Sequence, residues 1–337
     1  MSKNSIIAAA AVLALSIAGS AQAQSVADFY TGKTVTVVAP SGTGGSIYKY
    51  ALLVSNHLGR HIPGNPTSVA ESRGGGGGVK AANYMANAAP KDGTVVAELH
   101  PSSLIVPMIK DVQYDPRKFY WLGSIAVRTY VGAVWHTVET DTLEKMRDKE
   151  VVFGGSGTGS PSYMIPTFLA HVSGAKLKVV SGYKSGGATN LAMERGEVQG
   201  RGNFYQGFQA TNPDWIKDKK VKFAFKAGPD HPDLADAAPA SKYVKSDAEK
   251  QMLGLLEAPL ELGQSFYVVG DVPDDRKAAL RAAFESMLKD PVFLEDAKKL
   301  NLYINPLSHD RVASVVEEVY KTPKAVVDEL GSILEKK

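Results

Sequence analysis

Three glycine-rich turns carry the side chains of this sequence that are best suited to binding a ligand. The turns span residues 41–46, 74–78 and 155–160, and the first and third also contain serine and threonine. Each turn follows an apolar strand pattern and precedes a helix pattern. A helix N-terminus presents unpaired N–H groups and a partial positive charge, so such turns bind anions without needing a lysine or arginine. One turn alone could reflect turn geometry, but three in one chain favour a ligand cleft.

Polar residues within and beside the turns define this predicted site further. Ser156, Thr158 and Ser160 offer hydroxyls that can donate or accept hydrogen bonds. Arg73 precedes the second turn, and Tyr183 with Lys184 lies in a further glycine-containing turn. A cation at such a place would complement a carboxylate, although an ordinary surface charge is the alternative.

The motifs of common enzymes are incomplete here. The turn at 41–46 lacks a full G-x-G-x-x-G, and no G-x-x-x-x-G-K-[ST] is present. Around Ser156 the sequence is GGSGT, so G-x-S-x-G fails at its last position. We therefore predict a non-enzymatic protein with no catalytic residues. A secreted serine hydrolase using Ser156 or Ser160 is a remote alternative, which turnover of generic esters would revive.

Metal and cofactor sites are also not predicted. The absence of Cys excludes disulfides, Cys-based zinc sites, iron–sulfur ligation and a Cys nucleophile. His57 and His61 are four residues apart but lack an H-E-x-x-H motif, so a solvated helix face is favoured over zinc.

The N-terminal residues predict export. Lys3 precedes an apolar run of 13 residues at 6–18, and Ala21-Gln22-Ala23 supplies small residues for a signal peptidase. The run would span roughly 20 Å as a helix, too short for a hydrocarbon core of about 30 Å. We expect residues 1–23 to be a signal peptide cleaved after Ala23, and the mature protein to lie in the periplasm. An N-terminal anchor helix is the alternative.

Composition limits the partners. The 337 residues include 38 Lys+Arg against 35 Asp+Glu, with no block of five like charges, so nucleic acid is not expected. The length fits about two domains.

The elements that must position these residues alternate between strand and helix patterns, which predicts a parallel sheet wound with helices. Strands are expected at 34–39, 68–71, 94–99, 151–154, 177–180, 197–200 and 266–269. Helices are expected at 47–58, 79–88, 162–172, 188–195, 274–289, 292–300 and 309–330.

Five segments, taken in order, carry a family resemblance. They are KTVTVVAPSGTGG at 33–45, RGGGGG at 73–78 with KAANY at 80–84, APKDGT at 89–94, GSGTGS at 155–160, and GYKSGG at 182–187 followed by GEV at 196–198. This order and spacing resembles the substrate-binding proteins of the tripartite tricarboxylate transporter family, also called Bug-type periplasmic receptors.

The resemblance implies a type II periplasmic-binding fold, in which two α/β domains close on a ligand cleft like a Venus flytrap. It implies a monomeric receptor without a cofactor. Such a receptor captures a small carboxylate and hands it to a permease of one large and one small membrane subunit. We expect residues 24–122 plus 249–337 to form one domain and residues 123–248 the other. A sensor component that presents its ligand to a histidine kinase is the alternative, and only partner mapping separates the two.

The resemblance also implies site residues. In such receptors the first glycine loop and the loop at 155–160 hold carboxylates, largely through backbone amides, hydroxyls and waters. By position this implies Ser41, Thr43, Gly44, Ser46, Ser156, Thr158, Gly159 and Ser160. His100 and Ser102 follow the third strand and could face the cleft, and Asn203 with Tyr205 could close it.

Two departures from the family pattern leave the acid open. Many relatives carry an acidic residue shortly after the first loop, where this chain has Tyr48 followed by Lys49. The usual proline of the second loop is Gly74. Our hypothesis is that Tyr48 stacks on an aromatic acid, or that Lys49 or Arg73 pairs with a second carboxylate.

Overall fold

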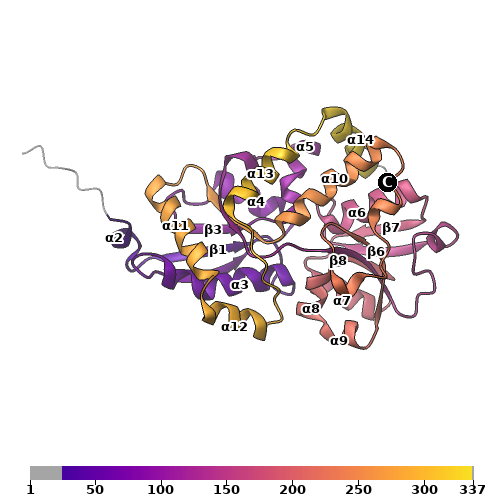
Figure 1. Cartoon of the computed structure of the whole chain (residues 1–337), viewed down its shortest axis with the longest axis horizontal. Helices are drawn as coiled ribbons and strands as arrows, with labels where there is room; N and C mark the ends of the chain where they lie inside the picture. Colours follow the sequence, from indigo (N-terminus) through magenta and orange to yellow (C-terminus); the bar gives the residue numbers. More distant parts are fainter. Residues whose placement is uncertain (1–24, 336–337) are drawn as a thin grey trace, which may run out of the picture.

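Two five-stranded sheets organise the chain, and the computed structural model describes residues 25–335 of it (Figure 1). The predicted signal peptide at 1–23 lies outside the described residues. The first sheet, which defines lobe 1, has the order β2 (Thr67–Ser72), β1 (Thr34–Ala39), β3 (Val95–Glu98), β10 (Ser265–Val269) and β4 (Phe119–Ser124). Strands β1, β2 and β3 are parallel, as predicted, whereas β10 runs antiparallel to both β3 and β4.

The second sheet defines lobe 2 and repeats this arrangement. Its order is β7 (Leu177–Ser181), β6 (Val151–Gly155), β8 (Gly200–Phe204), β5 (Tyr130–Trp135) and β9 (Val221–Ala227). Strands β6, β7 and β8 are parallel, and β5 pairs antiparallel with β8 and β9. Both sheets are therefore mixed, with a parallel half made by strand–turn–helix units.

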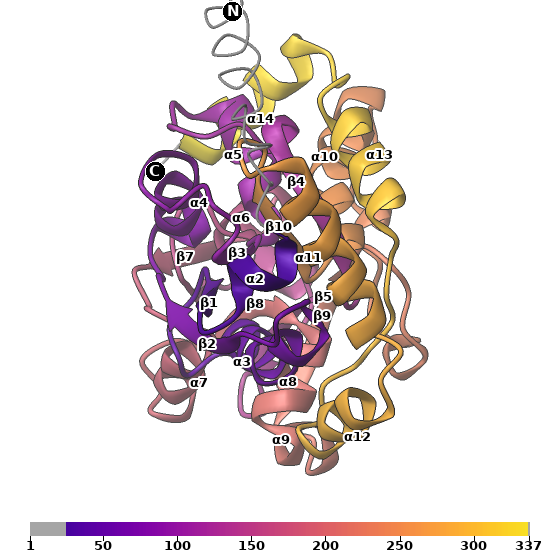
Figure 2. The ribbon, with the colours of Figure 1, turned by 90° about the vertical axis from the view of Figure 1, so that its left-hand side faces the viewer.

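Helices surround both sheets. They are α2 (Val26–Tyr30), α3 (Ser46–Leu58), α4 (Val79–Asn87), α5 (Val106–Ile109), α6 (Pro161–Ser173), α7 (Gly186–Glu194), α8 (Tyr205–Thr211), α9 (Pro213–Lys217), α10 (Asp247–Leu262), α11 (Asp274–Met287), α12 (Pro291–Lys299), α13 (His309–Val319) and α14 (Lys324–Glu335). Figure 2 views the molecule from the lobe 1 end, where α3 and α11 lie beside the strands. Among residues 25–335, no helix combines the length and the apolar character needed to cross a membrane.

Helix α3 shows how the sequence places an element against its sheet. Its buried residues Ile47, Tyr50, Ala51, Val54 and Leu58 recur at helical spacing and form one apolar face. This face packs on β1 and β2, so the N-terminus of α3 stays at the carboxyl end of β1.

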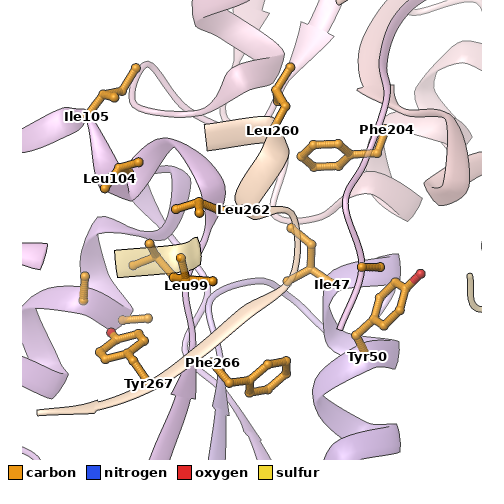
Figure 3. Close-up of a cluster of buried hydrophobic side chains, with 14 of the residues drawn as sticks. Ile47, Tyr50, Leu99, Leu104, Ile105, Phe204, Leu260, Leu262, Phe266 and Tyr267 are labelled. Atoms are coloured by element: carbon orange, nitrogen blue, oxygen red, sulfur yellow. The ribbon is translucent and has the colours of Figure 1, made fainter. Parts of the chain in front are cut away.

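The apolar core continues from one lobe into the other. Figure 3 shows Ile47 and Tyr50 of α3 with Phe266 of β10, and Phe204 of β8 joins the same cluster from lobe 2. Two helices also bridge the lobes, because α10 contacts both α13 and α6, and α14 contacts both α5 and α6. The lobes are therefore joined by packed side chains as well as by two chain connections, at residues 125–129 between β4 and β5 and at residues 228–264 between β9 and β10.

Two predicted elements are wrong. The strand expected at 197–200 is a turn, because Gly196 ends α7 with φ 72° and the strand begins only at Gly200. The helix expected at 309–330 is interrupted between Val319 and Lys324. Pro323 lacks an N–H and disfavours helical geometry at the residue before it, which explains the interruption.

Candidate functional site

A cavity of about 650 Å³ lies between the lobes, at the carboxyl ends of their parallel strands. Pro40 and Ser41 follow β1, Arg73 follows β2, and Ser156 follows β6 along its wall. The carboxyl ends of parallel strands are where ligands bind in open α/β sheets. Two such edges face each other here, so a molecule in the cavity would contact both lobes.

Four helices begin at the wall of this cavity. The residues that precede their first turns are Gly45 for α3, Gly78 for α4, Ser160 for α6 and Ser185 for α7. Only Ser185 caps its helix with a side-chain hydrogen bond, to the N–H of Ala188. The N-termini of α3, α4 and α6 have no side-chain cap, so their partial positive charges remain uncompensated by a side chain at the cavity. Helix α6 contributes fewer free N–H groups than the others, because Pro161 has none and the N–H groups of Tyr163 and Met164 donate to the carbonyl of Ser160.

The glycine run at 74–78 forms a left-handed segment of the wall. Four successive residues, Gly75 to Gly78, have φ of 136°, 59°, 68° and 95°, a conformation that residues with a Cβ rarely adopt. A Cβ on Gly77 would lie 2.6 Å from the backbone of Gly159 and Ser160, across the gap between the lobes. The run therefore combines a backbone conformation that glycine adopts readily with a close approach of lobe 2.

A chain of hydroxyls crosses the lobe 2 side of the cavity. Ser160 Oγ donates to the carbonyl of Gly157 at 2.7 Å and lies 2.7 Å from Ser162 Oγ, which also accepts the N–H of Ser156 at 3.0 Å. Because the Ser160 hydrogen is used on Gly157, Ser162 donates to Ser160. The hydroxyl of Ser156, 3.3 Å from Ser162 Oγ, keeps the weakest internal bond and can donate to a ligand.

On the lobe 1 side, Ser46 is oriented by a buried network. Arg128 donates through Nη2 to Ser46 Oγ at 3.1 Å and through Nη1 to Gln264 Oε1 at 2.8 Å. Gln264 in turn donates to Glu98 Oε1. Burial raises the pKa of Glu98 well above its ordinary value and lowers that of Arg128. Since Ser46 Oγ accepts from Arg128, the hydroxyl hydrogen of Ser46 remains available to the cavity.

His100 is held neutral beside this network. Burial, followed by the charge of Arg128, lowers the pKa of His100 to about 4. Its Nδ1 lies 3.0 Å from Ser102 Oγ, and the ring lines the cavity. At neutral pH it can therefore offer a hydrogen bond but no charge.

Arg201 is a cation of the site that the sequence analysis missed. It lies on β8, is 5% exposed and lines the cavity. Its Nη1 donates to the carbonyl of Gly186 at 2.5 Å and to Asn190 Oδ1 at 2.6 Å. Burial lowers the pKa of Arg201 to about 10, so the guanidinium stays charged at neutral pH. The sequence feature that could have indicated Arg201 is its position between two glycines, in GRGNF at 200–204.

Arg73, by contrast, has its charge balanced nearby. It forms an ion pair with Glu71 at 2.7 Å and stacks over the ring of Tyr84 at 3.4 Å. Both Arg73 and Glu71 line the cavity, so a ligand carboxylate would compete with Glu71 for this guanidinium.

The structure divides the predicted site residues into two groups. Eight of them line the cavity: Ser41, Ser46, Arg73, His100, Ser156, Ser160, Tyr183 and Asn203. Seven do not line it: Thr43, Gly44, Tyr48, Ser102, Thr158, Gly159 and Tyr205.

The residues outside the cavity wall have other contacts. Tyr205 begins α8 and its hydroxyl donates to Asp233 at 2.8 Å, so it does not close the cleft. Tyr48 packs against the apolar core, which removes it from any stacking position in the cavity. Thr158 accepts a bond from Lys110 Nζ at 3.0 Å. Ser102 Oγ lies 3.0 Å from His100 Nδ1, in a buried contact.

Two further expectations concern cations and metals. Lys49 Nζ donates to the carbonyl of Ala210 in lobe 2, so it joins the lobes and is not free to pair with a ligand. His57 and His61 contact Asp296 at 3.2 Å and Asp290 at 3.0 Å. Within residues 25–335, no three His, Asp or Glu side chains are grouped so that they could hold a metal ion.

Comparisons with known proteins bear on the fold. The sequence matches no protein-family profile and no curated protein. Among solved structures, it is similar to the periplasmic binding protein BugD, with TM-score 0.72 and 18% identity over 90% of this chain and 99% of that one. It is similar to MatC from Rhodopseudomonas palustris with bound malate, with TM-score 0.69 and 18% identity over 90% and 99%.

Another similar structure is that of a periplasmic transporter, with TM-score 0.70 and 22% identity over 89% of this chain and 98% of that one. These likenesses confirm the predicted fold class, two α/β domains of the periplasmic-binding type.

Proposed function

We propose that this chain is a substrate-binding protein of the tripartite tricarboxylate transporter family. It captures a small organic carboxylate outside the cytoplasm and delivers it to a permease of one large and one small membrane subunit. The observation that carries the proposal is the convergence of four helix N-termini on one cavity between the lobes. Such termini bind anions through backbone N–H groups and the helix dipole.

The ligands in similar structures support a carboxylate. MatC was solved with malate, and a second R. palustris protein, Rpa4515, with adipate, at TM-score 0.69 and 16% identity. The cavity of this chain offers such acids hydrogen-bond donors from backbone N–H groups, hydroxyls and the guanidinium of Arg201. Malate and adipate are therefore the first ligands to test.

The serine chemistry supports binding over hydrolysis. Ser156, Ser160 and Ser162 hydrogen-bond to one another and to backbone groups. A serine nucleophile is instead activated by a base that is itself oriented by a third group. The Ser160 and Ser162 hydroxyls donate within this chain, and the Ser156 hydroxyl at its end can donate to a bound anion.

We further propose that the protein works in the periplasm as a monomer, after removal of residues 1–23. One domain would comprise residues 24–122 plus 249–337, and the other residues 123–248. The connection at 125–129 agrees with a boundary near residue 123, since β4 belongs to the first sheet and β5 to the second.

A thermal-shift screen tests the proposal. Residues 24–337 are unfolded and refolded to remove any carried ligand, then heated with malate, adipate, citrate, benzoate or glutamate. A ligand at 100 times its Kd adds about 2.7 kcal/mol of stability. In a chain of this size, that raises the Tm by several degrees. Sodium chloride at equal ionic strength and the corresponding uncharged amides are the controls. Absence of a shift with all five acids would contradict the proposal.

A further inference from the structure

One buried cation faces the cavity without an acidic partner. Arg201 is 5% exposed, and within residues 25–335 its hydrogen bonds go to two backbone carbonyls and one amide oxygen. Burial lowers the pKa of Arg201, and no carboxylate of the described residues lies near enough to raise it. Arg73 differs because it pairs with Glu71, and Arg128 differs because Gln264 links it to Glu98.

The protein fixes this guanidinium and leaves one end of it open. Nη1 donates to the Gly186 carbonyl and to Asn190 Oδ1, and Nε donates to the Gly202 carbonyl at 3.3 Å. These bonds use three of the five N–H donors of the side chain. The two donors on Nη2 have no protein acceptor among the described residues. Nη2 is also not one of the polar atoms that are both buried and unpartnered, so it remains accessible from the cavity.

Asn190 has a positioning role in this arrangement. It is 3% exposed, it accepts from Arg201 Nη1 at 2.6 Å, and its amide donates to Asn212 Oδ1. A neutral amide at this place orients the guanidinium without neutralising it. An aspartate of nearly the same shape would accept from Arg201 and would also cancel its charge. It would lose the donor to Asn212 Oδ1, so the Asn212 amide would have to turn and donate to it instead.

An unpaired buried charge is costly, so a site that keeps one gains most from a ligand that supplies the counter-charge. We propose that Arg201 forms a direct ion pair, through Nη2, with a carboxylate of the ligand. A formal negative charge at that end of the molecule is then a requirement for binding. This inference rests on the proposed function and adds to it: helix N-termini and hydroxyls alone would also accept a neutral carbonyl group at this position.

The decisive variant is Asn190→Asp, which places a carboxylate against Arg201 from the protein side. Ligand-free protein should melt at a higher temperature, because the buried charge gains a partner. Affinity for the acid that binds wild-type protein most tightly in the five-acid screen should fall by about tenfold or more, since that acid loses its counter-charge. Asn56→Asp, on the exposed face of α3, adds the same charge away from the cavity and is the matched control.

Arg201→Gln and Arg201→Lys test the side chain itself. Truncating one partner of a buried ion pair typically weakens binding by about 30-fold or more. Lysine should not rescue it, because an ammonium cannot keep the bonds to Gly186 and Asn190 while reaching the ligand. Circular dichroism shows whether either variant folds, and Asn190→Asp keeps the inference testable if neither does.

Isothermal calorimetry separates the possible results. The expected result is weaker binding by Asn190→Asp with unchanged binding by Asn56→Asp, together with loss of binding when the ligand carboxylates are replaced by amides. If wild-type protein binds an acid and Asn190→Asp binds it equally well, the inference fails while the proposed function stands. If wild-type protein binds none of the five acids, both fail together.

Discussion

At the residue scale, His100 makes the stability of the protein depend on pH. Its pKa is about 4 in the fold against an ordinary value of 6.5, with burial as the main cause. The unfolded chain therefore binds a proton at a higher pH than the native protein does. The stability that neutral His100 permits is complete above pH 6.5 and is lost as the pH falls toward 4.

We predict that His100→Asn flattens this dependence. Between pH 7 and pH 4, the free energy of unfolding of wild-type protein should fall by about 3 kcal/mol more than that of the variant. Urea denaturation at several pH values measures the difference. His136→Asn, at an exposed histidine, is the control. If the free energy of unfolding depends on pH in the same way for wild type and His100→Asn, then protonation of His100 does not destabilise the fold, and the prediction is wrong.

Side chains at single positions were only partly predictable from the sequence. Ser46, Ser156 and Ser160 line the cavity because each stands at a strand–helix turn, which local patterns reveal. Arg201 was missed because its place in the cavity depends on contacts with Gly186 and Asn190, which are distant in the sequence. No local sequence pattern predicts such contacts. Asn203 lines the cavity as predicted, whereas Tyr205 does not, because β8 continues to Phe204 and α8 begins at Tyr205, whose hydroxyl donates to Asp233.

At the scale of elements, the glycine run at 74–78 determines how closely α4 and α6 can approach. Gly77 has φ 68°, and a Cβ there would lie 2.6 Å from Gly159 C and Ser160 N. Both atoms are backbone, so the N-terminal loop of α6 would have to move away. Such a movement separates two of the uncapped helix N-termini that face the cavity.

We predict that Gly77→Ala weakens ligand binding by about tenfold or more, equivalent to at least about 1.4 kcal/mol. Calorimetry with an acid that binds wild-type protein gives the measurement. Gly174→Ala is a matched control, because Gly174 has φ 72° but nothing lies within 4 Å of its added Cβ. Both variants carry the backbone strain of a left-handed alanine, about 1–2 kcal/mol. Equal affinity in the two would mean that the contact between lobes does not contribute to binding.

Elements with strong local patterns were predicted well, and those that depend on context were not. Strand β1 agrees with its prediction because TVTVVA is β-branched and apolar throughout. Strand β8 was displaced because GRGNF has two glycines and a buried charge, a composition that disfavours strands. The single helix expected at 309–330 ignored Pro323, a signal that was present in the sequence.

At the scale of the whole molecule, the lobes touch at both rims of the cavity. On one rim, a Cβ on Gly42 would lie 2.9 Å from the Lys184 carbonyl, and one on Gly187 would lie 2.4 Å from the Gly44 carbonyl. On the other, Gly77 approaches Gly159, and Lys110 bonds to Thr158. The distance between the lobes could not be predicted from the sequence, because it depends on long-range packing. Contacts on both rims imply that the lobes separate when a ligand enters or leaves.

The rim at Gly42 offers a direct test of that separation. A Cβ on Gly42 would lie 3.4 Å from Ser185 Cβ, close to the distance of about 3.5–4.5 Å found in disulfides. The chain has no cysteine, so Gly42→Cys with Ser185→Cys would create a single possible pair. Small shifts would be needed, because the new Cβ also approaches the Lys184 carbonyl, and α7 would lose its cap at a cost of about 1 kcal/mol.

We predict that the oxidised double variant cannot exchange ligand. Oxidised when empty, it should take up a radiolabelled acid at least about 100-fold more slowly than after reduction, because the disulfide holds the rim closed. Oxidised when loaded, it should retain the acid through dialysis and release it on addition of a reductant. Each single-cysteine variant, treated with the same oxidant, controls for the substitutions themselves. Exchange by the cross-linked protein at the rate of the reduced protein would show that the ligand passes through the mouth of the cavity without separation of the lobes at this rim.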